Sequence, residues 1–173
     1  SAAAAKFPAG CEGMLYHPYL QGEITPYLDD RLRASFTGVT ASHTKAHFNR
    51  AVLEGVAYSM KDCLETLQTL GIAPDRAVVL GGGAQSPLWR EILADMLGIP
   101  LTRVETADSS LGGAMLAGVA LGAFDSPADA VARCARTLEV TQPDPRTRAV
   151  YEEGFGIYKA IQAALAPIYG RMP

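Results

Sequence analysis

A run of three glycines, Gly81 to Gly83, is the part of this 173-residue sequence whose composition most directly indicates chemistry. Glycine permits backbone conformations that other residues avoid, and it lets a ligand come close to the main chain. Ser86 suits the N-cap of a following helix, and Pro87 suits its first turn, where no amide donor is needed. Such a turn presents backbone N–H groups and a positive dipole end, so we expect a phosphorylated or sugar-bearing ligand, provisionally a nucleotide.

Two well-known glycine-loop motifs fit this run incompletely. A Walker-type phosphate loop ends in Gly-Lys-Ser or Gly-Lys-Thr, and this loop has no lysine. A dinucleotide-binding fingerprint fits better, because Gly81, Gly83 and Ser86 resemble the GxGxxG pattern. Glu105 also closes the next strand, where a ribose-binding acid would stand. Against this alternative, a serine replaces the third glycine, a proline follows it, and a long helix precedes the strand. A dinucleotide-binding oxidoreductase fragment is therefore one alternative, and a non-catalytic nucleotide-binding or interaction module is another.

The sequence indicates no complete catalytic or metal site. It contains no GxSxG nucleophile motif and no cysteine and histidine pair at a telling spacing. His43 and His47 are four residues apart, but no HExxH glutamate lies between them and no third ligand is near. We expect these two histidines to cap a helix or to lie at the surface. We predict no catalytic residue and no metal ligand in this chain, so it resembles a binding half without a catalytic half.

Composition and charge restrict the class of protein and the class of partner. With 49% hydrophobic and 19% charged residues, the sequence is typical of one globular domain. The net charge is −3 and no cluster of lysine and arginine occurs, so we expect neither nucleic acid nor a membrane surface as partner. The longest apolar run, 111–124, is too short to span a bilayer. Three scattered cysteines are typical of a reducing compartment, and we predict a cytoplasmic location.

Hydrophobic periodicity places elements on both sides of the glycine loop. Apolar residues at every fourth position predict a long helix over 44–70, with Gly71 just beyond its end. Gly55, in the middle of this helix, indicates that a neighbouring element packs closely there. The β-branched run 77–80 predicts a strand covered on both faces, and 101–104 predicts a second strand. Because one helix separates the two strands, we expect a parallel pair in an α/β fold.

The remaining segments are predicted more coarsely. Residues 7–33 are interrupted by prolines and glycines, so we expect irregular chain in which Met14 to Tyr16 and Tyr19-Leu20 form short strands or a packed loop. Residues 35–39 are expected to be extended. Further helices are predicted over 87–97, from about 109 to about 123, over 127–136 and over 148–165.

Longer stretches of the chain resemble one protein family. Residues 34–39 (ASFTGV) and, seven residues later, 47–54 (HFNRAVLE) match the downstream signature of the FGGY carbohydrate kinases at every specified position. Residues 20–26 (LQGEITP) and 53–58 (LEGVAY) are similar to segments of the xylulokinase-type members. Residues 81–89 (GGGAQSPLW) resemble the adenosine motif of this kinase superfamily. The resemblance covers most of the chain.

This resemblance implies an α/β fold: the C-terminal part of an actin/hexokinase-like (ribonuclease H-like) ATPase lobe, helix-rich with a short parallel strand pair. It implies that residues 1–173 are an incomplete C-terminal nucleotide-binding lobe, with ATP in the cleft beside a second lobe. Carried over by position, Gly82 and Gly83 would contact the nucleotide through their backbone. Ala84 would leave room for the nucleotide, and Ser86 would reach its base or ribose.

The resemblance also implies a reaction and limits what this chain contributes to it. The reaction is the ATP-dependent phosphorylation of a sugar, D-xylulose to D-xylulose 5-phosphate, with ribulokinase or glycerol kinase specificity as alternatives. The family's phosphate motifs, sugar-binding residues and catalytic aspartate do not occur in this sequence, so Mg²⁺ and the sugar would be held mainly outside this chain. We therefore expect the chain alone to be inactive. Apolar surface left bare in such a fragment would favour a homodimer.

Overall fold

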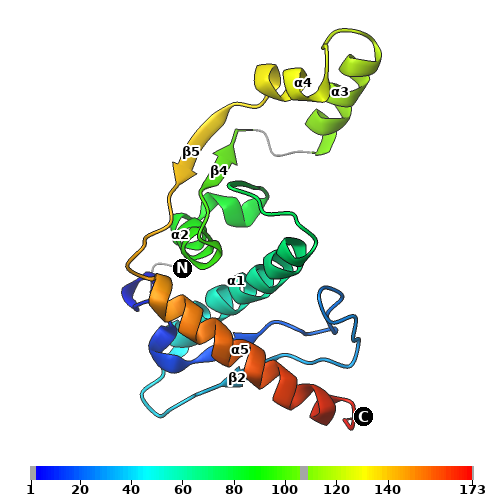
Figure 1. Cartoon of the computed structure of the whole chain (residues 1–173). Coiled ribbons are helices and arrows are strands. Elements are labelled where there is room, and N and C mark those ends of the chain that lie inside the picture. The colour runs from blue at the N-terminus through cyan, green and yellow to red at the C-terminus, as the bar shows by residue number, and fades with distance from the viewer. Residues whose placement is uncertain (1–2, 106–108, 173) are drawn as a thin grey trace.

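The computed structural model describes residues 3–105 and 109–172. Figure 1 shows a body built from three helices and a smaller helical pair that projects from it at the end of two strands. The body contains α1 (Lys45–Thr69), α2 (Pro87–Leu97) and α5 (Arg148–Tyr169), and the projecting pair consists of α3 (Ser109–Ala120) and α4 (Pro127–Cys134). None of the described helices combines the length and the apolar character needed to cross a bilayer.

The sheet beside the glycine loop contains the predicted parallel pair and one more strand. β3 (Ala77–Val79) and β4 (Leu101–Val104) run parallel, with Val78 opposite Thr102. β5 (Thr137–Thr141) pairs antiparallel with the other side of β4, so the strand order is β3-β4-β5. The prediction of a parallel pair is confirmed, and the sheet is mixed because β5 was not predicted.

The N-terminal segment contributes a separate two-stranded sheet. β1 (Leu15–His17) pairs antiparallel with β2 (Ser35–Thr37), with Tyr16 opposite Phe36. A strand near Met14 to Tyr16 is thus confirmed one residue later than predicted, and the extended piece at 35–39 is confirmed over its first three residues. Short 3₁₀ turns lie at η1 (Ala4–Lys6), η2 (Cys11–Gly13) and η3 (Gly82–Gln85).

Helix α1 begins and ends close to the predicted limits because its capping residues are local. His47 accepts a hydrogen bond at Nδ1 from the Thr44 amide (2.9 Å), which completes a capping box. Gly71 follows the helix with a φ of +81°, the left-handed conformation that favours glycine. A Cβ built on Gly55 would lie 2.1 Å from the carbonyl oxygen of Tyr16. The close approach of β1 therefore explains the mid-helix glycine, as predicted.

The later helices differ from prediction mainly at their C-terminal ends. α2 has the predicted limits and ends at Gly98, whose φ is +69°. α3 ends at Ala120 instead of about 123, and α4 ends at Cys134 because the next residues turn into β5. α5 extends past the predicted residue 165 and includes Pro167.

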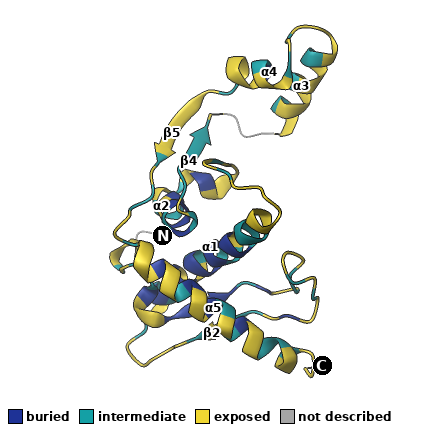
Figure 2. Cartoon of the chain, in the orientation of Figure 1, coloured by how far each residue is buried: buried dark blue, intermediate teal, exposed yellow. Residues whose placement is uncertain are grey.

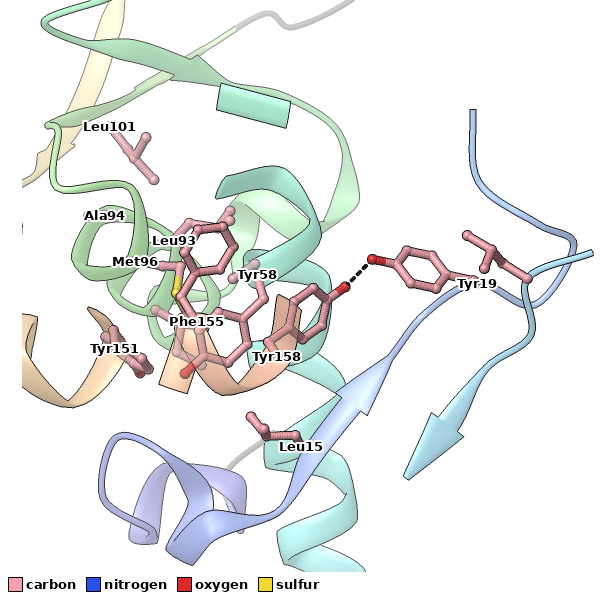
Figure 3. Close-up of a cluster of buried hydrophobic side chains, with 13 residues drawn as sticks. Leu15, Tyr19, Tyr58, Leu93, Ala94, Met96, Leu101, Tyr151, Phe155 and Tyr158 are labelled. Carbon is pink, nitrogen blue, oxygen red and sulfur yellow. Dashed lines mark hydrogen bonds between the residues drawn. The ribbon is translucent and has the colours of Figure 1, made fainter. Parts of the chain in front are cut away.

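The main core lies between α1, α2, α5 and β1, and aromatic rings fill its centre (Figure 3). The ring of Tyr58 stacks on those of Phe155 and Tyr158, with centroids 6.1 and 5.2 Å away. The hydroxyl groups of Tyr19 and Tyr158 share a hydrogen bond of 2.7 Å. These contacts fasten both the N-terminal segment and α1 to α5.

The prediction that the 77–80 strand is covered on both faces is wrong. Val78 and Leu80 are each 57% exposed, and Leu138 and Val140 of β5 are nearly half exposed. Figure 2 shows exposed residues along β5 and over α3 and α4. The strand is apolar enough for burial, but α3 and α4 lean away from the sheet and leave one of its faces open.

Candidate functional site

The glycine loop is a tight turn at the carboxyl end of β3. Gly81 has a φ of +81° and a ψ of −174°, a conformation that side chains disfavour. The first hydrogen bond of the following 3₁₀ turn runs from the Ala84 amide to the Gly81 carbonyl (3.1 Å). The amides of Gly82 and Gly83 therefore lie ahead of the bonded part of the turn, where a ligand can approach them.

Ser86 and Pro87 start α2 as predicted. The Ser86 hydroxyl accepts a hydrogen bond from the Trp89 amide (3.3 Å), and Pro87 occupies the first turn of the helix. A serine hydroxyl that accepts one hydrogen bond can still donate its own proton. Ser86 is partly exposed, so this proton is available to a ligand at the edge of the loop.

The three small residues of the turn occupy different environments. Gly82 is exposed, and a Cβ built on it would meet nothing within 4 Å. A Cβ on Gly83 would lie 3.1 Å from Nε1 of Trp89, so the indole ring packs against this residue. Ala84 is only 4% exposed. The backbone of the two glycines thus forms the open surface, and Ala84 anchors the turn from inside.

Arg90 fixes the turn to the sheet, and sequence reasoning missed it. Its Nη1 donates to the Ala84 carbonyl (2.6 Å) and its Nη2 to Oε2 of Glu139 in β5 (2.7 Å). Its Nε lies 3.4 Å from the hydroxyl of Thr141. Arg90 is 3% exposed and stands one turn after Ser86, at a position where α2 faces the core. A charged residue on the buried side of a predicted helix is the signal that could have identified it.

The second parallel strand ends at the same edge of the sheet. Ligands of open α/β sheets bind beyond the carboxyl ends of the parallel strands, which here follow Val79 and Val104. The carboxylate of Glu105 lies 3.7 Å from Nη1 of Arg136, and its amide donates to the Arg136 carbonyl (2.9 Å). The acid that the dinucleotide alternative requires for a ribose is therefore paired with an arginine.

The loop offers binding groups and no acid–base chemistry of its own. Arg90 is the one ionisable residue in 81–90. Groups with a shifted pKa lie elsewhere: burial raises the pKa of Glu54, against the opposing charge of Arg50, whose Nε is 2.7 Å from its carboxylate. Within 3–105 and 109–172, no three histidine, cysteine, aspartate or glutamate side chains are grouped to hold a metal ion. The predicted nucleotide contacts at Gly82, Gly83, Ala84 and Ser86 are thus close together, and their role stays a prediction.

Comparison with known proteins identifies a family for this chain. The model of the C-terminal domain of the FGGY family of carbohydrate kinases matches residues 1–121. The xylulose kinase of Staphylococcus epidermidis is 36% identical over 159 residues, which cover 91% of this chain and 32% of that protein.

Solved structures agree with this match. A ligand-bound xylulose kinase from Lactobacillus acidophilus superposes with a TM-score of 0.91 at 31% identity, covering 98% of this chain and 35% of that chain. A gluconate kinase from the same organism gives the same TM-score, identity and coverage. The chain spans about a third of the length of these relatives.

Proposed function

The chain belongs to the FGGY family of carbohydrate kinases, and from this premise we propose that it supplies the adenine and ribose side of an ATP site. Its fold is the C-terminal part of an actin/hexokinase-like lobe, helix-rich with a parallel strand pair. The proposed reaction is the ATP-dependent phosphorylation of a sugar. Residues 1–173 would form an incomplete C-terminal nucleotide-binding lobe.

The observation that carries this proposal is the open backbone of the glycine turn. Gly82 and Gly83 present amides ahead of the bonded part of the turn, at the carboxyl end of a parallel strand. No charged side chain points from this turn toward solvent, since Arg90 is buried against the Ala84 carbonyl. A neutral, flat group such as a nucleoside suits this surface better than a phosphate does.

We propose D-xylulose as the sugar, with D-xylulose 5-phosphate as the product. The support is the number of xylulose kinases among the similar proteins, including those of Staphylococcus epidermidis and Escherichia coli. The gluconate kinase of Lactobacillus acidophilus is equally similar in structure, so specificity would be decided by residues outside this chain.

We propose that the chain alone is inactive. Phosphoryl transfer needs a positioned hydroxyl, a base and Mg²⁺ on the phosphates. The sequence motifs that would position these groups in the family were not found in residues 1–173. A measurable rate of ATP-dependent phosphorylation of D-xylulose by the 173 residues would overturn this proposal.

The test of the nucleotide site is a titration with ADP and, separately, with NADH. We expect weak saturable binding of ADP, seen by calorimetry and as a change in the emission of Trp89, the single tryptophan, which packs against Gly83. NADH is expected to bind no better than an unrelated anion. Binding of NADH without ADP would support the dinucleotide alternative instead.

A matched pair of variants localises the site. Gly82→Ala adds a methyl group that meets nothing in the fold but occupies the proposed nucleotide surface, so it should weaken ADP binding without loss of stability. Gly156→Ala on α5 also adds a methyl group in open space, and it should leave ADP binding unchanged. Equal ADP affinity in both variants would contradict the proposed contact at Gly82.

The open sheet face supports a further part of the proposal, self-association as a homodimer. Val78 on β3 and Leu80 just after it are more than half exposed, as are Leu116 on α3 and Leu121 just after that helix. Exposed apolar side chains favour association when they gather on one surface. A monodisperse monomer at high concentration in light scattering would count against it. A cytoplasmic location, and partners that include neither nucleic acid nor membrane, stay predictions.

A further inference from the structure

The loop between β1 and β2, residues 18–34, exposes large apolar side chains to solvent. Leu20, Ile24 and Leu28 are 71%, 75% and 82% exposed. One exposed apolar side chain is common on a protein surface, but several in one loop indicate a surface that contacts another molecule. Figure 1 shows this loop, in blue, on the same side of the body as the C-terminal end of α5.

Hydrogen bonds within the 18–34 loop and to α1 hold it in one conformation. The Glu23 amide donates to the Asp29 carbonyl (3.0 Å), and the Asp29 amide donates to the Glu23 carbonyl (2.9 Å). The Tyr27 hydroxyl donates to the carboxylate of Asp62 on α1. Within this frame Leu28 has a φ of +48°, a conformation that bulky side chains disfavour. The fold therefore holds Leu28 in a strained conformation without burying it, which indicates a contact outside this chain.

Two hollows adjoin at Asp29 on this side of the body. The first, of about 550 Å³, is walled in part by Ile24 and Leu28. The second, of about 380 Å³, lies between the 18–34 loop and the C-terminal end of α5, where small and apolar residues within 163–171 line it. Because Asp29 lines both hollows, the projecting apolar side chains and the recess beside α5 belong to one surface.

The charges on this surface have both signs. Asp29 and Arg31 neutralise each other, with Nε of the arginine 2.9 Å from Oδ1 of the aspartate. Asp30 lines the first hollow and Arg171 the second, and both are exposed. Neither of these two side chains forms a hydrogen bond or an ion pair with the described residues, 3–105 and 109–172. A surface that carries a projection, a recess, a free acid and a free base can match a rotated copy of itself, as a twofold interface requires.

We propose that this surface joins two copies of the chain about a twofold axis. Leu28 of each copy enters the hollow beside α5 of the other copy, and Asp30 of each copy pairs with Arg171 of the other. This inference rests on the proposed self-association and assigns it a surface. That surface shares no residue with the open sheet face around Val78 and Leu80.

Sedimentation velocity over a range of concentrations measures the dissociation constant of the dimer. Leu28→Asn removes the apolar side chain, and asparagine tolerates the left-handed conformation at this position. We expect the dissociation constant to rise at least about tenfold, because each copy loses one leucine that the dimer buries. Urea denaturation should show no loss of monomer stability. Leu70→Asn, at a residue 71% exposed just after α1, is the matched control and should leave the dissociation constant unchanged.

A charge exchange tests the proposed ion pairs. Asp30→Arg and Arg171→Asp each place like charges opposite one another, so each should weaken the dimer about threefold. The double variant restores both pairs with reversed sign, so it should recover most of the wild-type affinity. A double variant that is weaker than either single variant would overturn the proposed interface.

Leu80→Asn distinguishes this surface from the open sheet face. A dimer that persists in Leu80→Asn and dissociates in Leu28→Asn would support the inference. The reverse result would overturn the inference and leave self-association through the sheet face standing. A wild-type chain that stays monomeric at high concentration would overturn both modes of association, and it would leave the proposed nucleotide site untouched.

Discussion

The substitution Arg90→Met tests whether one buried arginine holds the glycine loop in place. Methionine keeps much of the length and apolar volume of arginine but donates no hydrogen bond. The Ala84 carbonyl, now bonded to Nη1 at 2.6 Å in a residue only 4% exposed, would lose its partner. The turn that presents Gly82 and Gly83 would then be tied to the sheet only through its two ends.

The expected cost follows from two contacts. Leaving a buried carbonyl unpaired costs about 1–3 kcal/mol. The pair with Glu139, whose side chain is 46% exposed, contributes about 0–1 kcal/mol. Together these predict a loss of about 1–4 kcal/mol in the free energy of unfolding. Glu139→Gln is the matched control, because it removes the charge of the partner and keeps the contact with Ala84, and its loss should not exceed about 1 kcal/mol.

Urea denaturation followed by far-UV circular dichroism measures both variants. The emission of Trp89 in the native state gives a second readout, since its ring lies against Gly83. We expect a shift of that emission in Arg90→Met and none in Glu139→Gln. Equal unfolding free energies in the two variants, with unchanged tryptophan emission, would refute the role of Arg90.

Two further predictions concern the core beneath the site. Gly55→Ala places a methyl group 2.1 Å from the Tyr16 carbonyl oxygen, so it should lower the free energy of unfolding by about 2 kcal/mol. Gly156→Ala adds its methyl group in open space on α5, so it should raise the free energy of unfolding by about 0.5–1 kcal/mol. The urea concentrations at the midpoints of unfolding measure both changes. A Gly55→Ala protein as stable as the wild type would contradict the close packing of Gly55 against the Tyr16 carbonyl. Burial lowers the pKa of His17 in the folded chain. As the pH falls, the unfolded chain therefore protonates at His17 before the folded chain does, and the free energy of unfolding falls below about pH 6.5. The variant His17→Asn should show a flatter pH dependence there, and equal slopes would disprove the assignment.

Structural features that depend on a few neighbouring residues could be predicted from the sequence. The N-cap at Ser86 with Pro87 behind it predicted the start of α2, and Gly98 marked its end. Gly55 indicated a close neighbour, although the sequence did not show that the neighbour is Tyr16 of β1. In each case the residue type and the local backbone requirement coincide, so no distant contact had to be known.

Features that depend on distant pairing were missed. β5 has only five residues, and its stability comes from pairing with β4, which precedes it by more than thirty residues. Arg90 was overlooked for the same reason, because its partner Glu139 lies on that strand. The strand over 77–80 was predicted to be buried because its composition suits burial, but composition does not reveal whether a covering element is present.

The open sheet face lies next to the glycine loop in the chain. Val78 and Leu80 are each 57% exposed, and Leu80 is followed directly by Gly81. An element that covers these two side chains would reach the edge of the turn, so it would also limit the freedom of Gly82 and Gly83. A ligand binds more tightly to a turn that is already ordered, because less conformational entropy is lost on binding. Nucleotide affinity should therefore rise when the apolar face of β3 is covered, and ADP should in turn strengthen whatever association covers it.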